Sequence, residues 1–411
     1  MGDDRKLSGK DIPTPDIFRE VEPFKPDVRR GLRKFFISDR VDPARLGDSV
    51  AQYLDGNCMG FAVQLRQRGK ILCERHAGWA RMPADGATLF TQSTVMTIAS
   101  AGKVFTGIAA VRLLEDEGFR LDVTKPDPLD VPIAPYLPAA WPRHREVDNL
   151  SFYDLLNHRS GLGVHEPWMA KGGDVGWARR AIQRGPDGPP DYNNVNYILL
   201  RILMHEVLNR RSASPAPAIH APAFDGHTIP DWEPVDVQLQ KASAASFDHY
   251  MHTMLFGPAC SGANLYAPDG RAWHYHWPYD GDHAELGDID GAAGSGGWYM
   301  SANGLLRAAA VLRRGNSFLS PERTQDAFGR GIGVWGSYPT PLGVVHCKGG
   351  SSNIGGANGK DLIQGTGLYL LPDAMELGVL INSTGPADWF LHMIDLIRNS
   401  IRPWNMFTGF R

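Results

Sequence analysis

Two short hydrophobic runs in the first third of the chain predict a β-hairpin. They cover residues 61–65 and 71–76, and the polar segment Arg68-Gly69-Lys70 between them has the composition of a tight turn. Before this hairpin, Asp42-Pro43 predicts the start of a helix, because Asp caps a first turn and Pro fits the first helical position. This helix is expected to end after Leu54.

In the middle of the chain, hydrophobic residues recur at the spacing of amphipathic helices. One helix is expected to begin at Ser100, and residues 194–209 show the same amphipathic spacing. Ser151 and Asp154 predict a third helix start through a capping box. Extended runs then return near the C-terminus, at residues 343–347, 367–371 and 378–382.

Strands at both ends and helices between them predict an α+β fold. We expect a mainly antiparallel sheet, flanked by helices and built from residues 41–118 and 290–411, with a mainly helical domain over residues 119–289 inserted into it. Residues 1–40 are expected to form a polar N-terminal extension, and the Pro/Ala-rich residues 211–236 a flap. A binding site is expected at the seam between the two parts.

The composition is that of a globular protein without an excess of positive charge. Hydrophobic residues make up 43% of the 411 residues, and 42 basic against 45 acidic side chains give a net charge of −3. Binding to nucleic acid is therefore not expected. The chain also lacks an apolar run of about 18 residues, so no contact with a membrane is expected.

The cysteines and the N-terminal residues favour the cytoplasm. The four cysteines are scattered, with no C-x-x-C pair, which disfavours a disulfide framework or a zinc knuckle. The N-terminal residues are charged and contain prolines, without the apolar segment of a secretory signal. The sequence leaves the oligomeric state open.

Ser100 and Lys103 form an S-x-x-K pair at the start of a predicted helix. The i, i+3 spacing places the hydroxyl and the amine on one helical face. A serine becomes a good nucleophile when a base takes its proton, and a lysine can do so if burial or a nearby cation lowers its pKa. The pair therefore indicates a candidate nucleophile with its base, although such short matches also arise by chance.

Two further segments carry candidate chemistry. Tyr192-Asn193-Asn194 is a Y-x-N segment, in which a lysine would favour the tyrosine's phenolate for proton transfer and the asparagine could hold a lysine or a substrate amide. Residues 348–351, Lys-Gly-Gly-Ser, follow an apolar strand, where glycines would let a ligand approach the backbone N–H groups. The alternatives are a helix cap for the first segment and a Gly-rich turn for the second.

Together and in this order, the three segments resemble those of the serine β-lactamase and penicillin-binding-protein superfamily. The nearest branch is that of the class C β-lactamases, family VIII carboxylesterases and D-amino-acid amidases, and the resemblance spans about residues 61–384. Residues 152–162 are similar to its LLxHxSGL segment, and residues 296–303 to its GGxxSxxD helix start. Residues 331–335 resemble the strand before its third motif.

The resemblance implies the catalytic residues. Ser100 matches the nucleophile that becomes acylated, Lys103 its activating base, and Tyr192 a general base or acid. Which of Lys103 and Tyr192 takes the serine proton stays open. The superfamily needs no metal and no organic cofactor, so none is expected here.

The resemblance also implies the residues that bind substrate. Asn194 matches the asparagine of the second motif, and Lys348 the lysine of the third, with Gly350 beside it. The backbone N–H groups of Ser100 and Ser351 match the oxyanion hole.

The third motif departs from the usual K-T-G or H-x-G. Here it reads Lys348-Gly349-Gly350, which removes a hydroxyl donor, and His346 offers a rival register for the motif. Asn303 stands where an aspartate is usual. These departures point away from penicillin hydrolysis and toward a dedicated acyl substrate.

His274-x-His276 could place two imidazoles on one face of a strand, where a metal site is conceivable. The aromatic residues around 273–279 fit either packing or a pocket for an apolar acyl group. We favour the reading without a metal.

The leading hypothesis is a serine hydrolase, of the carboxylesterase or amidase kind, that cleaves a small-molecule ester or amide through an acyl-enzyme on Ser100. One alternative is an acyltransferase, peptide cyclase or thioesterase on the same scaffold, in which another nucleophile replaces water. The other is a non-catalytic binding protein, which would be expected to have lost its nucleophile or base.

Overall fold

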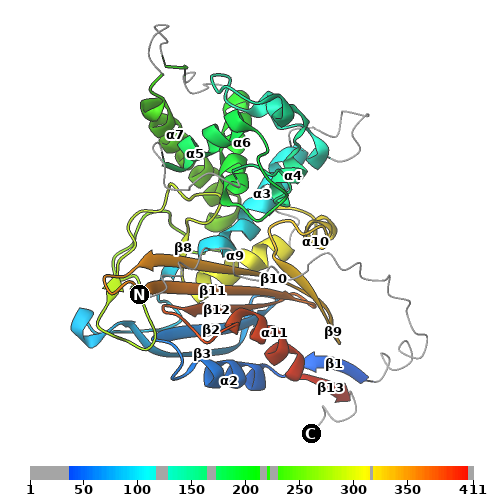
Figure 1. Ribbon diagram of the computed structural model, residues 1–411. Helices are drawn as coiled ribbons and strands as arrows, with labels where there is room; N and C mark the ends of the chain where they lie inside the picture. Colours follow the sequence, from blue (N-terminus) through cyan, green and yellow to red (C-terminus); the bar gives the residue numbers. More distant parts are fainter. Residues whose placement is uncertain are drawn as a thin grey trace, which may run out of the picture. The chain divides into compact units, whose positions relative to one another are not determined.

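A nine-stranded sheet is the largest element of the structure (Figure 1). The structure is a computed structural model, and it describes residues 37–116, 128–163, 173–212, 220–222, 230–314 and 318–405. The strands run in the order β4-β3-β2-β12-β11-β10-β9, and β6 and β7 join beside β11. They are β2 (Gly60–Gln67), β3 (Lys70–Arg81), β4 (Thr88–Leu89), β6 (His274–Tyr275), β7 (His283–Ala284), β9 (Gly336–Thr340), β10 (Gly343–Gly355), β11 (Asp361–Leu371) and β12 (Met375–Ile381).

Antiparallel pairing of β2 with β12 joins the two ends of the chain in one sheet. Val63 of β2 lies opposite Val379 of β12, and the predicted β2–β3 hairpin continues the sheet on the far side of β2. A separate pair, β5 (Met96–Thr97) with β8 (Tyr299–Met300), leads into the segment that carries Ser100. The predicted α+β fold with a sheet built from both chain ends is confirmed.

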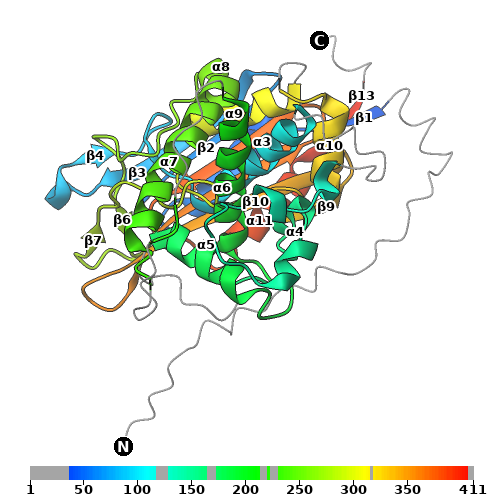
Figure 2. The same cartoon turned by 90° about the horizontal axis from the view of Figure 1, so that it is seen from above.

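Helices cover both faces of this sheet. Seen from above, α3, α6 and α9 lie over the strands (Figure 2), and α2 packs against β2 and β3. The helices are α2 (Pro43–Leu54), α3 (Lys103–Asp116), α4 (Phe152–Leu156), α5 (Gly173–Arg184), α6 (Asn194–Arg211), α7 (Glu233–Met251), α8 (Gly257–Ala259), α9 (Ala302–Arg314), α10 (Pro321–Gly329) and α11 (Trp389–Asn399). A π-helical turn, His252–Phe256, connects α7 to α8.

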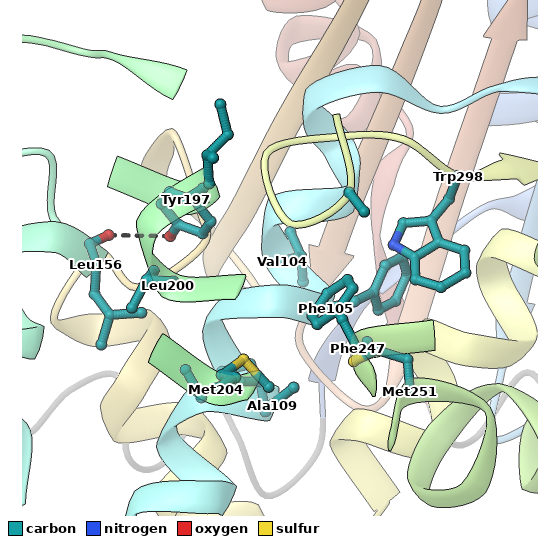
Figure 3. Packing of buried hydrophobic residues seen from close by; sticks show 14 of the residues in the cluster. Val104, Phe105, Ala109, Leu156, Tyr197, Leu200, Met204, Phe247, Met251 and Trp298 are labelled. Atoms are coloured by element: carbon teal, nitrogen blue, oxygen red, sulfur yellow. Dashed lines mark hydrogen bonds between the residues drawn. The ribbon is translucent and has the colours of Figure 1, made fainter. Parts of the chain in front are cut away.

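Two hydrophobic cores follow from the alternation of side chains along the strands. In β12, Leu380 belongs to the core under α3, α6 and α9, whereas Val379 and Ile381 belong to the core under α2 and α11. In the larger core Phe247 packs near Trp298, with ring centroids 5.9 Å apart, and Tyr197 Oη donates to the Leu156 carbonyl at 3.0 Å (Figure 3). This packing fixes α3 and α6, the helices that begin at Lys103 and Asn194.

Local signals explain where several helices begin. The Asp42 side chain accepts from Arg45 N, and Pro43 occupies the first turn, so α2 begins as predicted. Ser151 and Asp154 form the predicted capping box of α4.

The C-terminal strands differ from the prediction in one respect that matters for the site. The strand expected at residues 343–347 continues as β10 to Gly355, so the Lys348–Ser351 segment lies within the strand. Gly349 lies opposite Gly367 and Gly350 opposite Thr366, and this ladder extends the strand through the glycines. The segment before β9, residues 331–335, is a turn and not a strand.

The chain divides into two compact units, Val41–Ile401 and a second unit of Met1–Arg40 with Arg402–Arg411. The described residues of the second unit belong to the pair β1 (Ile37–Val41) and β13 (Ile401–Asn405). Most of the predicted extension 1–40 lies outside the described residues. The boundaries predicted within 41–411 stay a prediction.

Only the ends of the predicted flap 211–236 are described in helices. Arg211 is the last residue of α6, and Glu233 is the first residue of α7. Residues 213–219 and 223–229 lie outside the described residues. Among the helices that are described, none has the length and apolar character needed to cross a membrane.

Candidate active site

Ser100 lies in a 3-10 turn, η2 (Ala99–Gly102), directly before α3. The helix was expected to begin at Ser100, but the α-helix begins at Lys103. Ala99 adopts a φ of 44°, a left-handed conformation that costs a non-glycine residue energy and breaks a helical start. The turn therefore places Ser100 beside the N-terminal end of α3, where backbone N–H groups favour negative charge.

Lys103 is fully buried, and its Nζ is surrounded by three oxygen atoms. The nitrogen lies 3.1 Å from Ser100 Oγ and 2.7 Å from Asn194 Oδ1, and it contacts the Ser295 carbonyl oxygen. The structure therefore brings together the hydroxyl, the amine and the amide that the first two motifs indicated.

Burial lowers the pKa of Lys103 well below its usual value of 10.5, and the cation of Lys348 lowers this pKa further. A neutral amine has two N–H donors and one lone pair. Asn194 Oδ1 and the Ser295 carbonyl can accept the two donors, which leaves the lone pair for the Ser100 hydroxyl proton. This geometry suits Lys103 as a base.

Tyr192 also contacts the Ser100 hydroxyl. Its Oη donates to Ser100 Oγ at 2.8 Å, and its ring lies 5.0 Å from Lys103 Nζ. Desolvation raises the pKa of Tyr192 to about 12, against the smaller lowering effect of the hydrogen bond to Ser100. Because 42% of the residue is exposed, solvent weakens this desolvation. A raised pKa favours the phenol and not the phenolate that a nearby lysine was expected to favour, and the Tyr192 hydroxyl is placed as a hydrogen-bond donor to Ser100.

Lys348 is buried, and its ammonium group faces two aromatic rings. Its Nζ lies 4.6 Å from the ring centroid of Tyr192 and 5.2 Å from that of Trp335. Desolvation lowers the pKa of Lys348 to about 7, opposed only weakly by the Cys347 thiol. The charge of Lys348 therefore changes close to neutral pH.

The β10 backbone passes directly beside the Ser100 turn at Gly350. A Cβ atom on Gly350 would lie 2.3 Å from the Ile98 carbonyl oxygen and 2.9 Å from Ser100 N. Only glycine fits this approach. Ser351, the next residue of β10, lies opposite Gly365 of β11, and its own side chain is exposed.

His346 lies outside this cluster. Its Nδ1 shares a hydrogen bond with Ser337 Oγ at 2.7 Å, and its Nε2 lies 2.9 Å from Gln325 Nε2. Burial lowers the pKa of His346 to about 4. The ring connects α10 to β9 and β10, so the structure places Lys348, not His346, beside Ser100.

Three residues of the site were not singled out from the sequence. Ser295 supplies the carbonyl for Lys103 from a Gly-rich loop. The His158 ring contacts the Tyr192 ring at a tilt of 42°, with centroids 4.4 Å apart, and His158 belongs to the LLxHxSGL-like segment. Trp335 stacks on Tyr192 with centroids 5.8 Å apart, and it is the last residue of the segment 331–335 that resembled the strand before the third motif.

The two histidines considered as metal ligands have separate polar partners. His274 Nε2 lies 3.0 Å from Ser352 Oγ, and His276 Nδ1 lies 3.4 Å from the Pro278 carbonyl. Within the part of the chain that the structure describes, no three His, Cys, Asp or Glu side chains gather as metal ligands would.

The chain is similar to β-lactamases in sequence and in fold. Residues 46–214 match the family model described as Beta-lactamase, and this range contains Ser100, Lys103, Tyr192 and Asn194 but not Lys348. No curated relative matches the chain.

Solved structures share the fold across most of the chain at low sequence identity. A class C β-lactamase from Rhodobacter sphaeroides is 19% identical with a TM-score of 0.56, over 86% of this chain and 97% of that one. FmtA from Staphylococcus aureus is 17% identical with a TM-score of 0.59, over 89% and 91%. The D-amino acid amidase from Ochrobactrum anthropi SV3 is 16% identical with a TM-score of 0.56, over 86% and 98%. The resemblance to the β-lactamase and penicillin-binding-protein superfamily is confirmed.

Proposed function

We propose that this β-lactamase-like protein is a serine hydrolase that cleaves an ester or amide through an acyl-enzyme on Ser100. One observation carries the proposal: Ser100 Oγ lies between Tyr192 Oη at 2.8 Å and Lys103 Nζ at 3.1 Å. A hydroxyl held between a proton donor and a buried amine is set up to lose its proton as it attacks.

Lys103 takes the proton of Ser100 in this mechanism. Burial and the neighbouring Lys348 lower the pKa of Lys103, which favours the neutral amine that a base requires. Asn194 Oδ1 holds the nitrogen at 2.7 Å and orients its lone pair toward the hydroxyl.

Tyr192 gives its proton to the leaving atom. Its raised pKa, about 12, keeps the phenol protonated at neutral pH. As the bond from Ser100 Oγ to the acyl carbon forms, the bond to the leaving oxygen or nitrogen breaks, and that atom takes the Tyr192 proton. Lys103 then returns a proton to Tyr192, and water releases the acyl group in a second, similar step.

The Ser100 turn and β10 provide the oxyanion site. Negative charge on the carbonyl oxygen would develop next to the N-terminus of α3, because Ser100 lies in the turn directly before this helix. The close approach of Gly350 to Ser100 N supports Ser351 N–H as the second donor, as in the superfamily.

Labelling with an alkyl fluorophosphonate tests the proposal without assuming a substrate. The wild-type protein should form a stoichiometric adduct at neutral pH, and Ser100→Ala should form none. Ser93→Ala is a matched control, because Ser93 is exposed and hydrogen-bonds Thr91 and not Ser100, Lys103 or Tyr192. Equal labelling of wild type and Ser100→Ala would contradict the proposal.

A further inference from the structure

Three aromatic rings extend in a row from the Ser100 hydroxyl, and we call them the aromatic wall: Tyr192, Trp335 and Phe390. The Tyr192 and Trp335 rings are nearly parallel, with centroids 5.8 Å apart and an interplanar angle of 16°. Phe390 lies beyond Trp335, with centroids 6.4 Å apart. The three rings come from the segment before α6, the turn before β9 and the first turn of α11, so tertiary structure alone assembles them.

The wall is open to solvent where it adjoins the nucleophile. Trp335 is 47% exposed and Tyr192 42% exposed, although both rings belong to a packed row. Large aromatic surfaces left exposed beside a reactive group usually mark a ligand contact, since burying them against a ligand is favourable.

The unusual third motif is coupled to this wall. A Cβ atom on Gly349 would lie 3.1 Å from two ring carbons of Phe390, so a threonine there would force Phe390 to move. Glycine at 349 therefore permits the ring to sit against β10, and it replaces a hydroxyl donor by an aromatic surface.

The ammonium group of Lys348 lies against two rings of the aromatic wall. Lys348 Nζ lies 4.6 Å from the Tyr192 centroid and 5.2 Å from the Trp335 centroid. Within the described part of the chain, no carboxylate forms an ion pair with Lys348, and the Cys347 thiol is the one group that raises its pKa. Two aromatic rings thus contact this cation, and their exposed parts are apolar surface beside it.

The position of Tyr192 fixes which half of a substrate meets the wall. In the proposed mechanism Tyr192 Oη gives its proton to the leaving atom, so the leaving group lies on the Tyr192 side of Ser100. Trp335 stacks on the ring of that same tyrosine. The leaving group and Trp335 are therefore neighbours.

From these observations we propose that Trp335 binds the leaving group and that the preferred substrates are esters of phenols or amides of aromatic amines. This inference rests on the proposed function. In the reaction, the bond from Ser100 Oγ to the acyl carbon forms and the bond from that carbon to the aryl oxygen or nitrogen breaks. The phenol or arylamine leaves with the proton from Tyr192.

The test compares phenyl acetate with 2,2,2-trifluoroethyl acetate, which share an acyl group. The measured quantity is the ratio of kcat/KM for the aryl ester to that for the alkyl ester, so the intrinsic reactivities cancel between enzyme variants. Trp335→Ala should lower this ratio about tenfold, because it loses an aromatic pair and its buried area. Trp335→Tyr, which keeps a ring, should restore most of the ratio.

Two further variants make the comparison specific. Leu89→Ala should leave the ratio unchanged, since Leu89 is 60% exposed on β4 at the opposite edge of the sheet from β9. Gly349→Thr should lower the ratio, because the new side chain displaces Phe390.

The outcomes separate this inference from the proposed function. If alkyl fluorophosphonate labels Ser100 but the ratio is the same within about twofold in Trp335→Ala, the aryl preference is wrong and the hydrolase proposal stands. If wild type is neither labelled nor active on either ester, both are wrong. Should Trp335→Ala fail to fold, Trp335→Leu replaces it. Saturation-transfer NMR on Ser100→Ala should then show acetanilide, but not N-cyclohexylacetamide, bound in a Trp335-dependent way, and equal binding of the two amides would overturn the inference.

Discussion

Burial divides the proton chemistry among three side chains around Ser100. Lys103 and Lys348 are both buried, and desolvation lowers the pKa of each; the charge of Lys348 lowers the pKa of Lys103 further. Desolvation instead raises the pKa of Tyr192 to about 12. The sequence predicted that these residues act together, because spacing and resemblance indicate them. It could not assign base and acid, because burial depends on segments that fold against them from elsewhere in the chain.

Lys103→Ala tests the assignment of the base. The acylation rate should fall by about 10³-fold or more, since no other described group within hydrogen-bond distance of Ser100 Oγ has a lowered pKa. Pre-steady-state release of p-nitrophenol from an acyl ester measures this rate. Lys70→Ala, at the exposed first position of β3, should acylate normally. A rate within tenfold of wild type for Lys103→Ala would assign the base to another group.

Lys348 gives the site a pH dependence near neutrality. Its folded-state pKa of about 7 lies below the usual 10.5, so the ammonium form is present below pH 7 and is lost above it. For a substrate with a carboxylate on its leaving group, KM should therefore rise as pH increases from 6 to 8. Lys348→Ala should raise KM at pH 6 and remove this dependence, with kcat less affected. A KM that is independent of both pH and the substitution would show that the cation does not meet the substrate.

Strand β10 is the element that completes the site. Its apolar first half was predictable from hydrophobic alternation, but its continuation through Lys348–Ser351 was not, because glycines usually end a strand. Pairing with β11 keeps these glycines in the strand, and the close approach of β10 to the Ser100 turn requires the glycine at position 350. The sequence around β10 does not indicate that β11 and the Ser100 turn are its partners.

Gly350→Ala should uncouple β10 from the nucleophile. The new methyl group would overlap the Ile98 carbonyl and the Ser100 amide, so the strand must move away and carry the Ser351 N–H with it. Acylation should slow by about 10²- to 10³-fold, the effect of losing one oxyanion donor. Gly355→Ala on the same strand is the matched control, because nothing lies within 4 Å of its Cβ position. Equal acylation rates in the two variants would argue against an oxyanion role for this part of β10.

His346 has a structural role in our account, not a catalytic one. His346→Ala should leave Ser100 acylation intact and lower the free energy of unfolding by about 1–3 kcal/mol, since Ser337 and Gln325 lose a buried partner. The pKa of His346 is about 4 in the folded protein, below the usual 6.5. Between pH 6.5 and pH 4 the unfolded state therefore binds a proton that the folded state does not, and His346 lowers the free energy of unfolding as the pH falls through this range. The free energy of unfolding, measured with urea, should fall less from pH 7 to pH 5 in the variant than in the wild type. Loss of acylation with unchanged stability would instead favour His346 as the third-motif residue.

At the scale of the whole molecule, the antiparallel sheet brings distant motifs into one site. Pairing of β10 with β11 holds Lys348 in the sheet, where its Nζ contacts the ring of Tyr192, a residue 156 positions earlier in the chain. The order of strands and helices predicted the α+β class. The aromatic wall could not be predicted, because Trp335 and Phe390 meet only through the packing of β9, β10 and α11.

Intact-protein mass spectrometry tests the central claim most directly. Wild-type protein is mixed with a panel of p-nitrophenyl acyl esters and a cephalosporin, beside Ser100→Ala, and any adduct is mapped by peptide analysis. We predict a mass increase equal to the acyl group, located on Ser100, for at least one ester, and none in Ser100→Ala. Hydrolysis of an ester by Ser100→Ala at the wild-type rate, or an adduct on another residue, would contradict the account.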